Sequence, residues 1–259
     1  MAAELRKQER GHFRSLTWPV ASAVASVVGL AWYVTWSTSD LTMALMPLPA
    51  ALPGIERLAL FFALLVVMMV AMMLPSALPM VLMYAGLSRL EAGRPTRPAD
   101  LVGTALFSSA YFVVWGAFVV VALVGLMALG LMGPMVGDLA FAPAVVLVAA
   151  GLFQATRTKE VCLSHCQSPM AFVLGHWRPG RLGALRMGLR HAMYCVGCCW
   201  LFMLVLFVAG AMSLVWMGVL SVVIFAEKLG PKQILLSRVI GVLLVILGVL
   251  VAVRTAWVM

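Results

Sequence analysis

A long stretch without a charged side chain constrains this chain most. No Asp, Glu, Lys or Arg occurs between Arg190 and Glu227. As one straight α-helix this stretch would measure about 54 Å, because a helix rises about 1.5 Å per residue. The hydrocarbon layer of a membrane is only about 30 Å thick. The stretch therefore predicts two membrane-crossing helices, 188–209 and 211–227, that turn back around Gly210.

The composition extends this interpretation to the whole chain. Of its 259 residues, 64% are hydrophobic and only 10% are charged, which is far more apolar than a soluble domain requires. Further apolar runs are close to the roughly 20 residues that one crossing needs. We therefore expect an all-α, polytopic transmembrane helix bundle of about seven helices, within a range of six to eight. The expected helices are 17–36, 58–88, 103–130, 139–155, 188–209, 211–227 and 236–254.

The run 58–88 contains two prolines, Pro75 and Pro79. Proline lacks an N–H and clashes with the carbonyl four residues earlier, so a helix bends or breaks there. We predict one kinked or broken helix whose freed carbonyls, those of Ala71 and Pro75, line a polar cavity. A re-entrant pair of half-helices is the alternative.

The distribution of Lys and Arg predicts the orientation. With a cytoplasmic N-terminus, all of the 18 Lys and Arg residues except Arg57 and Arg254 fall on the cytoplasmic side, as the positive-inside rule requires. This arrangement gives a cytoplasmic tail (1–16), one transmembrane domain (17–259) and a cytoplasmic connection (156–190). Topology then accounts for the net charge of +9, so we expect the lipid bilayer and no nucleic acid as a partner. The oligomeric state stays open.

All five cysteines lie within one short part of the chain and form two groups. In a helix, Cys162 and Cys166 lie one turn apart, and Cys195 shares a face with Cys198 and Cys199. Two sulfurs bound to one metal ion at about 2.3 Å lie roughly 4 Å apart, which this spacing allows. Because the cytosol keeps thiols reduced, such clusters are more often metal ligands or catalytic thiols than disulfides. The groups therefore predict a metal site of two to five thiolates, with the triad roughly 5–15 Å inside the inner leaflet.

A site rich in sulfur and poor in acidic oxygens favours soft metal ions. Cu(I) fits first, and Zn(II), an iron–sulfur cluster and Hg(II) follow. Further ligand candidates are less specific, because methionine and histidine are also ordinary packing residues. These candidates are His165, His191, Met72, Met73 and Met80. Glu227 and Lys228 are expected to form an ion pair at the membrane interface, or to gate an ion.

Two other functions stay open. The chain could be an enzyme, a membrane thiol-disulfide oxidoreductase with Cys195 and Cys198 as a C-x-x-C redox pair and Cys162 and Cys166 as a second dithiol. The additional thiol of Cys199, and the placing of both pairs on one side, favour metal binding over redox shuttling. The other possibility is an accessory subunit that binds a cluster or haem, although no C-x-x-C-H haem motif is present.

Four stretches resemble a known family. They are MMLPSALPM at 72–80, QATRTKEVCLSHCQSP at 154–169, GLRHAMYCVGCCWLFMLVLFVAGAMSLVWM at 188–217 and FAEKLGP at 225–231. From about residue 57 onward the chain is similar to bacterial integral membrane proteins described as predicted metal-binding and often labelled copper chaperones. The resemblance implies a multi-pass protein of the bacterial cytoplasmic (inner) membrane that binds metal through the two cysteine groups. We therefore expect a binding protein or transporter that holds Cu(I) near the cytoplasmic face and exchanges it with a metal-donor or metal-acceptor protein.

Overall fold

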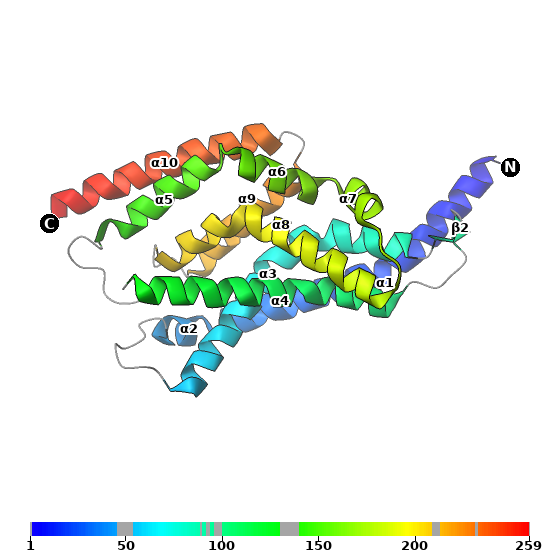
Figure 1. Cartoon of the computed structure of the whole chain (residues 1–259), viewed down its shortest axis with the longest axis horizontal. Helices are drawn as coiled ribbons and strands as arrows, with labels where there is room; N and C mark the ends of the chain where they lie inside the picture. Colours follow the sequence, from blue (N-terminus) through cyan, green and yellow to red (C-terminus); the bar gives the residue numbers. More distant parts are fainter. Residues whose placement is uncertain are drawn as a thin grey trace.

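The computed structural model of the protein is built almost entirely of helices (Figure 1). It describes residues 2–45, 54–88, 90–91, 94–95, 100–129, 140–208, 213–230 and 233–258. The helices are α1 (Ala2–Ser37), α2 (Ser39–Leu45), α3 (Ile55–Leu87), α4 (Leu101–Ala128), α5 (Ala142–Phe153), α6 (Arg157–Gln167), α7 (Pro169–His176), α8 (Gly180–Val208), α9 (Leu214–Leu229) and α10 (Gln233–Val258). Strands β1 (Leu90–Glu91) and β2 (Arg94–Pro95) form one short antiparallel pair. The predicted all-α class is confirmed.

Five of these helices are long and apolar enough to cross a membrane. They are α1 from Trp18 onward, α3, α4, α8 and α10. The predicted crossings at 139–155 and 211–227 correspond to α5, with 12 residues, and α9, with 16 residues. Both are shorter than the roughly 17 residues of a minimal crossing, so the number of seven crossings stays a prediction. The predicted turn around Gly210 lies outside the described residues.

Helix α3 continues through both of its prolines as one helix of 33 residues. The chain therefore does not turn back at Pro75 or Pro79, and the re-entrant alternative was wrong. Hydroxyl groups lie close to the backbone just before the first proline: Ser76 donates to the Met73 carbonyl at 2.8 Å, and Ser221 of α9 donates to the Met72 carbonyl at 3.4 Å. Such side chains satisfy backbone groups near a proline in an apolar environment.

Helices α3, α4 and α8 form the centre of the bundle. Helix α4 packs against both α3 and α8, while α1 lies along α3 and the short α6 packs on α8 (Figure 1). The largest buried cluster lies among these helices and α9, and it contains aromatic, methionine and cysteine side chains. The residues from which we predict a metal site are therefore part of the central core.

Helices α5 and α10 run side by side (Figure 1) and join the bundle where α5 packs on α8 and α10 packs on α9. Their contact depends on two glycines: a Cβ on Gly241 would lie 2.7 Å from the carbonyl oxygen of Gly151, and a Cβ on Gly151 would lie 2.6 Å from that of Gly241. Small residues allow this close approach of membrane helices. The other face of α10 exposes apolar side chains such as Leu243 and Leu250, which suits contact with lipid.

Candidate functional site

Helix α8 carries three thiols in the core of the bundle. Cys195, Cys198 and Cys199 are all buried, with at most 2% of each side chain exposed. The sulfurs of Cys198 and Cys199 both lie near the carbonyl oxygen of Cys195, at 3.1 and 2.8 Å. The predicted spacing on one helix face is therefore present, and all five cysteines of the chain are free.

Helix α6 brings the other two cysteines to this triad. The Thr156 side chain caps α6 by accepting from the Lys159 N–H at 3.3 Å, as expected of an N-cap threonine. Cys162 lies against Gly197 of α8 so closely that a Cβ at position 197 would be 2.7 Å from its sulfur. The Cys166 thiol hydrogen-bonds with that of Cys198. The two cysteine groups predicted from the sequence thus meet across one interface between helices.

Both α6 thiols hold their protons firmly. Burial raises the pKa of Cys162, and proximity to Cys198 adds to this shift while Lys159 opposes it. The hydrogen bond with Cys198, together with burial, raises the pKa of Cys166 well above its ordinary value. Because metal ions bind the thiolate form, binding at these two residues must release protons.

The methionine candidates separate into two sets. The sulfur of Met73 lies 3.7 Å from that of Cys199, and Met72 belongs to the same buried cluster as the cysteines. Met80, seven residues after Met73 on α3, packs instead in a second cluster that contains Tyr84. The structure therefore brings Met73 to the cysteines and leaves Met80 apart from them.

The two histidine candidates lie among aromatic rings. His165 stacks on Tyr194 with 4.1 Å between ring centroids, and its Nδ1 lies 2.8 Å from the Val161 carbonyl oxygen. His191 is buried between Tyr111 and Phe172, with ring centroids 5.7 and 5.1 Å away. Its Nδ1 has no hydrogen-bond partner among the described residues, and neither has the hydroxyl of Tyr111. His191 is therefore the better placed of the two to accept a new partner.

A buried lysine lies directly at the triad. The Nζ of Lys228, on α9, is 3.0 Å from the sulfur of Cys195 and 3.0 Å from the hydroxyl of Ser76. Only 3% of this lysine is exposed, and within the described residues no carboxylate pairs with it. A buried ammonium without a counter-charge is strongly unfavourable. The position thus favours negative charge on the neighbouring sulfur.

A second buried lysine anchors the other side of the triad. Lys159 of α6 donates to the Cys198 carbonyl and to Glu227 Oε2, both at 2.7 Å. Glu227 also accepts from Ser237 at 3.3 Å, and Ser237 donates to Gln154 at 3.0 Å. This buried network links α5, α6, α8, α9 and α10 around the thiols.

The predicted interface pair of Glu227 with Lys228 was therefore wrong. Consecutive residues on a helix point in different directions, so Glu227 reaches Lys159 while Lys228 reaches Cys195. The sequence does contain a signal for these residues, because charged side chains at the edge of long apolar runs are frequently functional. Lys159, Glu227 and Lys228 all occur within the motifs that carry the family resemblance.

The thiols do not form a preassembled site for three or more ligands. Within the part of the chain that the structure describes, no group of three His, Cys, Asp or Glu side chains is arranged to hold a metal ion. Instead, the thiols lie next to one another in a row: Cys198 lies next to Cys166 and Cys199, and Cys199 also lies next to Cys195 and the Met73 thioether. Neighbouring sulfurs in such a row suit an ion that takes few ligands.

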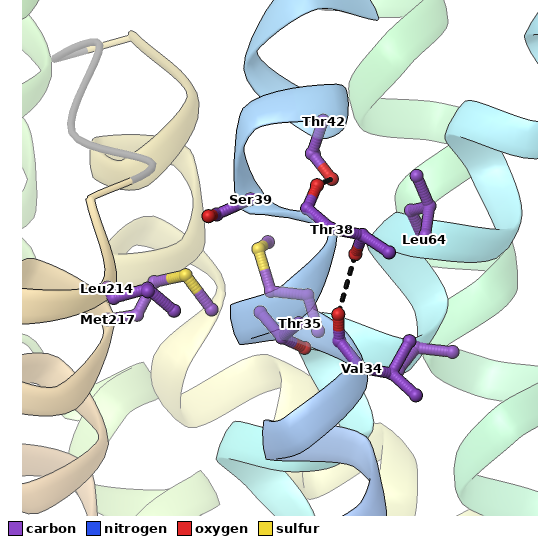
Figure 2. A pocket seen from close by; sticks show the side chains of 10 residues that line it. Val34, Thr35, Thr38, Ser39, Thr42, Leu64, Leu214 and Met217 are labelled. Atoms are coloured by element: carbon purple, nitrogen blue, oxygen red, sulfur yellow. Dashed lines mark hydrogen bonds between the residues drawn. The ribbon is translucent and has the colours of Figure 1, made fainter.

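A hollow lined by hydroxyl groups lies at another part of the bundle, between α1, α2, α3 and α9 (Figure 2). Its hydroxyls are bonded within their own helical turns, as in the bond of 2.7 Å from Thr38 to the Val34 carbonyl. The space of about 10 Å³ admits at most one water molecule. The hollow is therefore not a site for a larger ligand, although the thioethers of Met68 and Met217 reach it.

Comparison with known proteins supplies one match. A family model described as "PpoB2: Copper chaperone" matches residues 62–251. This range includes α3 from its third turn, all five cysteines, both buried lysines and most of α10. No curated protein and no solved structure matches the chain.

Proposed function

The chain belongs to the PpoB2 copper chaperone family, and from this premise we propose that it holds Cu(I) between α6 and α8 and hands the ion on to, or transports it towards, a partner protein. The ligands are drawn from Cys162, Cys166, Cys195, Cys198 and Cys199. The proposed location is the cytoplasmic membrane of a bacterium, with the N-terminus and α6 on the cytoplasmic side. The observation that carries the proposal is the convergence of both cysteine groups beside Lys228.

The separation of the sulfurs supports a ligand pair. Two sulfurs bound to one ion at about 2.3 Å lie about 4.0 Å apart when the angle between the bonds is about 120°, and about 4.6 Å apart in a linear two-coordinate site. The Cys199 and Met73 sulfurs are 3.7 Å apart, so an ion could bind both after they separate by less than about 1 Å. Met73 is therefore the strongest methionine candidate.

The number of ligands supports Cu(I) over the other candidate metals. Structural zinc sites and iron–sulfur clusters are generally held by four protein ligands, whereas Cu(I) is stable with two or three sulfurs. Among the described residues no group of three His, Cys, Asp or Glu side chains is arranged to hold a metal ion. A two-coordinate soft ion needs the least rearrangement of this core.

The charge at the site supports a monovalent ion. Lys159 and Glu227 neutralise each other, whereas Lys228 retains one positive charge against Cys195. Two thiolates with Cu(I) carry a net charge of −1 and would neutralise Lys228. Two thiolates with a divalent ion carry no net charge and would leave the lysine uncompensated in the core, which is unfavourable.

The methionines of α3 offer a route for the ion. Met68, Met69, Met72 and Met73 are all buried in the cluster that contains the cysteines. Met73 touches Cys199, and both Met68 and Met217 line the hollow of Figure 2. Because thioethers bind Cu(I) weakly compared with thiolates, a row of them would let the ion move from the triad without being released into lipid.

Anaerobic Cu(I) titration against a chromogenic chelator tests this proposal. We expect the purified wild-type protein to bind Cu(I) stoichiometrically and the double variant Cys198→Ser/Cys199→Ser to lose this binding. Met80→Leu is the matched control, because Met80 packs in the second cluster, and it should bind as the wild type does. Unchanged binding by the double serine variant would contradict the proposal. A reversible disulfide confined to Cys195 and Cys198 would instead favour the oxidoreductase.

A further inference from the structure

A basic hollow of about 460 Å³ lies where α8 begins. Three arginines line it, Arg178, Arg186 and Arg190, together with His176 and Trp177. None of the five cysteines lines this hollow, so it is separate from the proposed metal site. Its chemistry is that of an anion site, since an arginine guanidinium offers planar, paired donors that match phosphate or carboxylate oxygens.

Local backbone geometry brings the three arginines together. Arg186 and Arg190 are four residues apart on α8, so they share one face of the helix. Arg178 lies in the link between α7 and α8, which turns back at Gly180 with φ of +81°. A Cβ on Gly183 would overlap the Arg178 carbonyl oxygen. Glycine at position 183 therefore permits the link to fold onto the first turns of α8.

Aromatic contacts fix the other wall of the hollow. Trp177 packs against Tyr84 of α3 with 5.8 Å between ring centroids, and His176 stacks on Phe172 at 4.7 Å. The Nδ1 of His176 also lies 2.9 Å from the Phe172 carbonyl oxygen. The hollow is thus built by packing and is more than a row of surface cations.

The three arginines of this hollow form no ion pair with the protein groups that the structure describes. The ion pairs among the described residues are Lys159 with Glu227 and Arg238 with Glu160, and neither involves the three arginines. The candidate membrane span of α8 starts at Gly180, and tryptophan is typical of the membrane interface. We infer that this hollow binds a phosphate-bearing anion, either the headgroup of an anionic phospholipid or free inorganic phosphate.

Native mass spectrometry of the full-length, delipidated protein tests this inference. Phosphatidylglycerol and phosphatidylcholine are titrated separately, and inorganic phosphate is titrated by calorimetry. The test variant is Arg178→Gln/Arg186→Gln/Arg190→Gln. The matched control is Arg57→Gln/Arg238→Gln/Arg254→Gln, which removes the same charge from exposed positions elsewhere.

Three outcomes distinguish a lipid headgroup site, a site for free phosphate and the absence of an anion site. Each arginine beside an anionic headgroup contributes about fivefold in affinity, so the test variant should lose the preference for phosphatidylglycerol while the control keeps it. Saturable binding of phosphate that only the test variant loses, without a lipid preference, would support the anion site with a soluble ligand. Equal behaviour of the two variants, or no anion preference in the wild type, would overturn the inference.

Gly183→Val provides a second variant that keeps every charge. Its side chain would displace Arg178 from the start of α8, so anion binding should weaken although the net charge is unchanged. Gly218→Val is its control, because Gly218 does not line the hollow and a Cβ at position 218 meets nothing within 4 Å. Wild-type anion affinity in a folded Gly183→Val protein would count against the described geometry of the hollow.

Discussion

The Nζ of Lys228 lies 3.0 Å from the sulfur of Cys195, and both side chains are buried. The two residues come from different helices, α9 and α8. A positive charge at this distance stabilises a thiolate in the apolar core. This contact links the buried charge of the protein to the proposed metal site.

Replacing this lysine should weaken metal binding. A hydrogen bond to a charged group contributes about 1.5–3 kcal/mol, so Lys228→Met should raise the Kd for Cu(I) by about 10- to 150-fold. Competition with a Cu(I) chelator measures the change. Arg238→Met is the control, since Arg238 is exposed and forms a surface ion pair with Glu160. Wild-type Cu(I) affinity in the Lys228→Met protein would show that this lysine does not contribute to metal binding.

The buried pair of Lys159 and Glu227 should contribute to stability as a unit. Removing one partner leaves the other charge buried and unpaired, which costs about 3–5 kcal/mol. Lys159→Met and Glu227→Leu should therefore each lower the free energy of unfolding by about this amount. The double variant Lys159→Met/Glu227→Leu should regain most of the loss. Unfolding in mixed detergent micelles gives the free energy of unfolding of the wild type, the two single variants and the double variant. If the losses of the two single variants add up in the double variant, the pairing is contradicted.

The contact of α5 with α10 should be sensitive to side-chain size. Gly241→Val places atoms where the Gly151 carbonyl oxygen lies, 2.7 Å from the new Cβ. Overpacking of this kind costs about 1–3 kcal/mol, which thermal unfolding in detergent would detect. Gly218→Val should change the stability much less, because a Cβ at position 218 meets nothing within 4 Å. Similar values for the two variants would show that the helices do not touch there.

The α6 thiols should react only at high pH. Because the pKa values of Cys162 and Cys166 are raised, both stay protonated at neutral pH, and their thiolate forms appear as the pH rises above the range of an ordinary thiol. Mass spectrometry can follow the rate of alkylation at each residue between about pH 7 and pH 11, a range around the ordinary pKa of a thiol. This rate should level off at a higher pH than the rate for N-acetylcysteine does. For the same reason, apparent Cu(I) affinity should increase with pH. A rate that levels off at the same pH as for N-acetylcysteine, or at a lower pH, would contradict the raised pKa values.

Local features of the sequence were sufficient for the class of protein and for the helices that carry the site. The predicted helix 58–88 corresponds to α3 at Ile55–Leu87, and 103–130 corresponds to α4 at Leu101–Ala128. The spacing of Cys195, Cys198 and Cys199 on one face of a helix was also correct. These properties depend on charge-free length and helical periodicity, which are readable over a few turns.

The partners of the site residues could not be predicted in this way. Lys228 contacts a cysteine 33 residues away, Lys159 pairs with an acid 68 residues away, and Met73 meets a thiol 126 residues away. Each contact requires two helices to pack at a particular rotation and depth, and no local pattern specifies either. The predicted ion pair of Glu227 with Lys228 was wrong because it assumed that neighbours in the sequence are also partners in the structure.

By itself, the sequence determined that this is an apolar helical protein with two cysteine groups, because helix formation and membrane partition depend on local composition. Only the tertiary structure decided that α6 lies on α8, that a buried lysine faces Cys195 and that a thioether meets Cys199. The physical reason is that side-chain packing between helices, and the need of each buried charge for a partner, select one arrangement of helices. The proposed copper site depends on that arrangement.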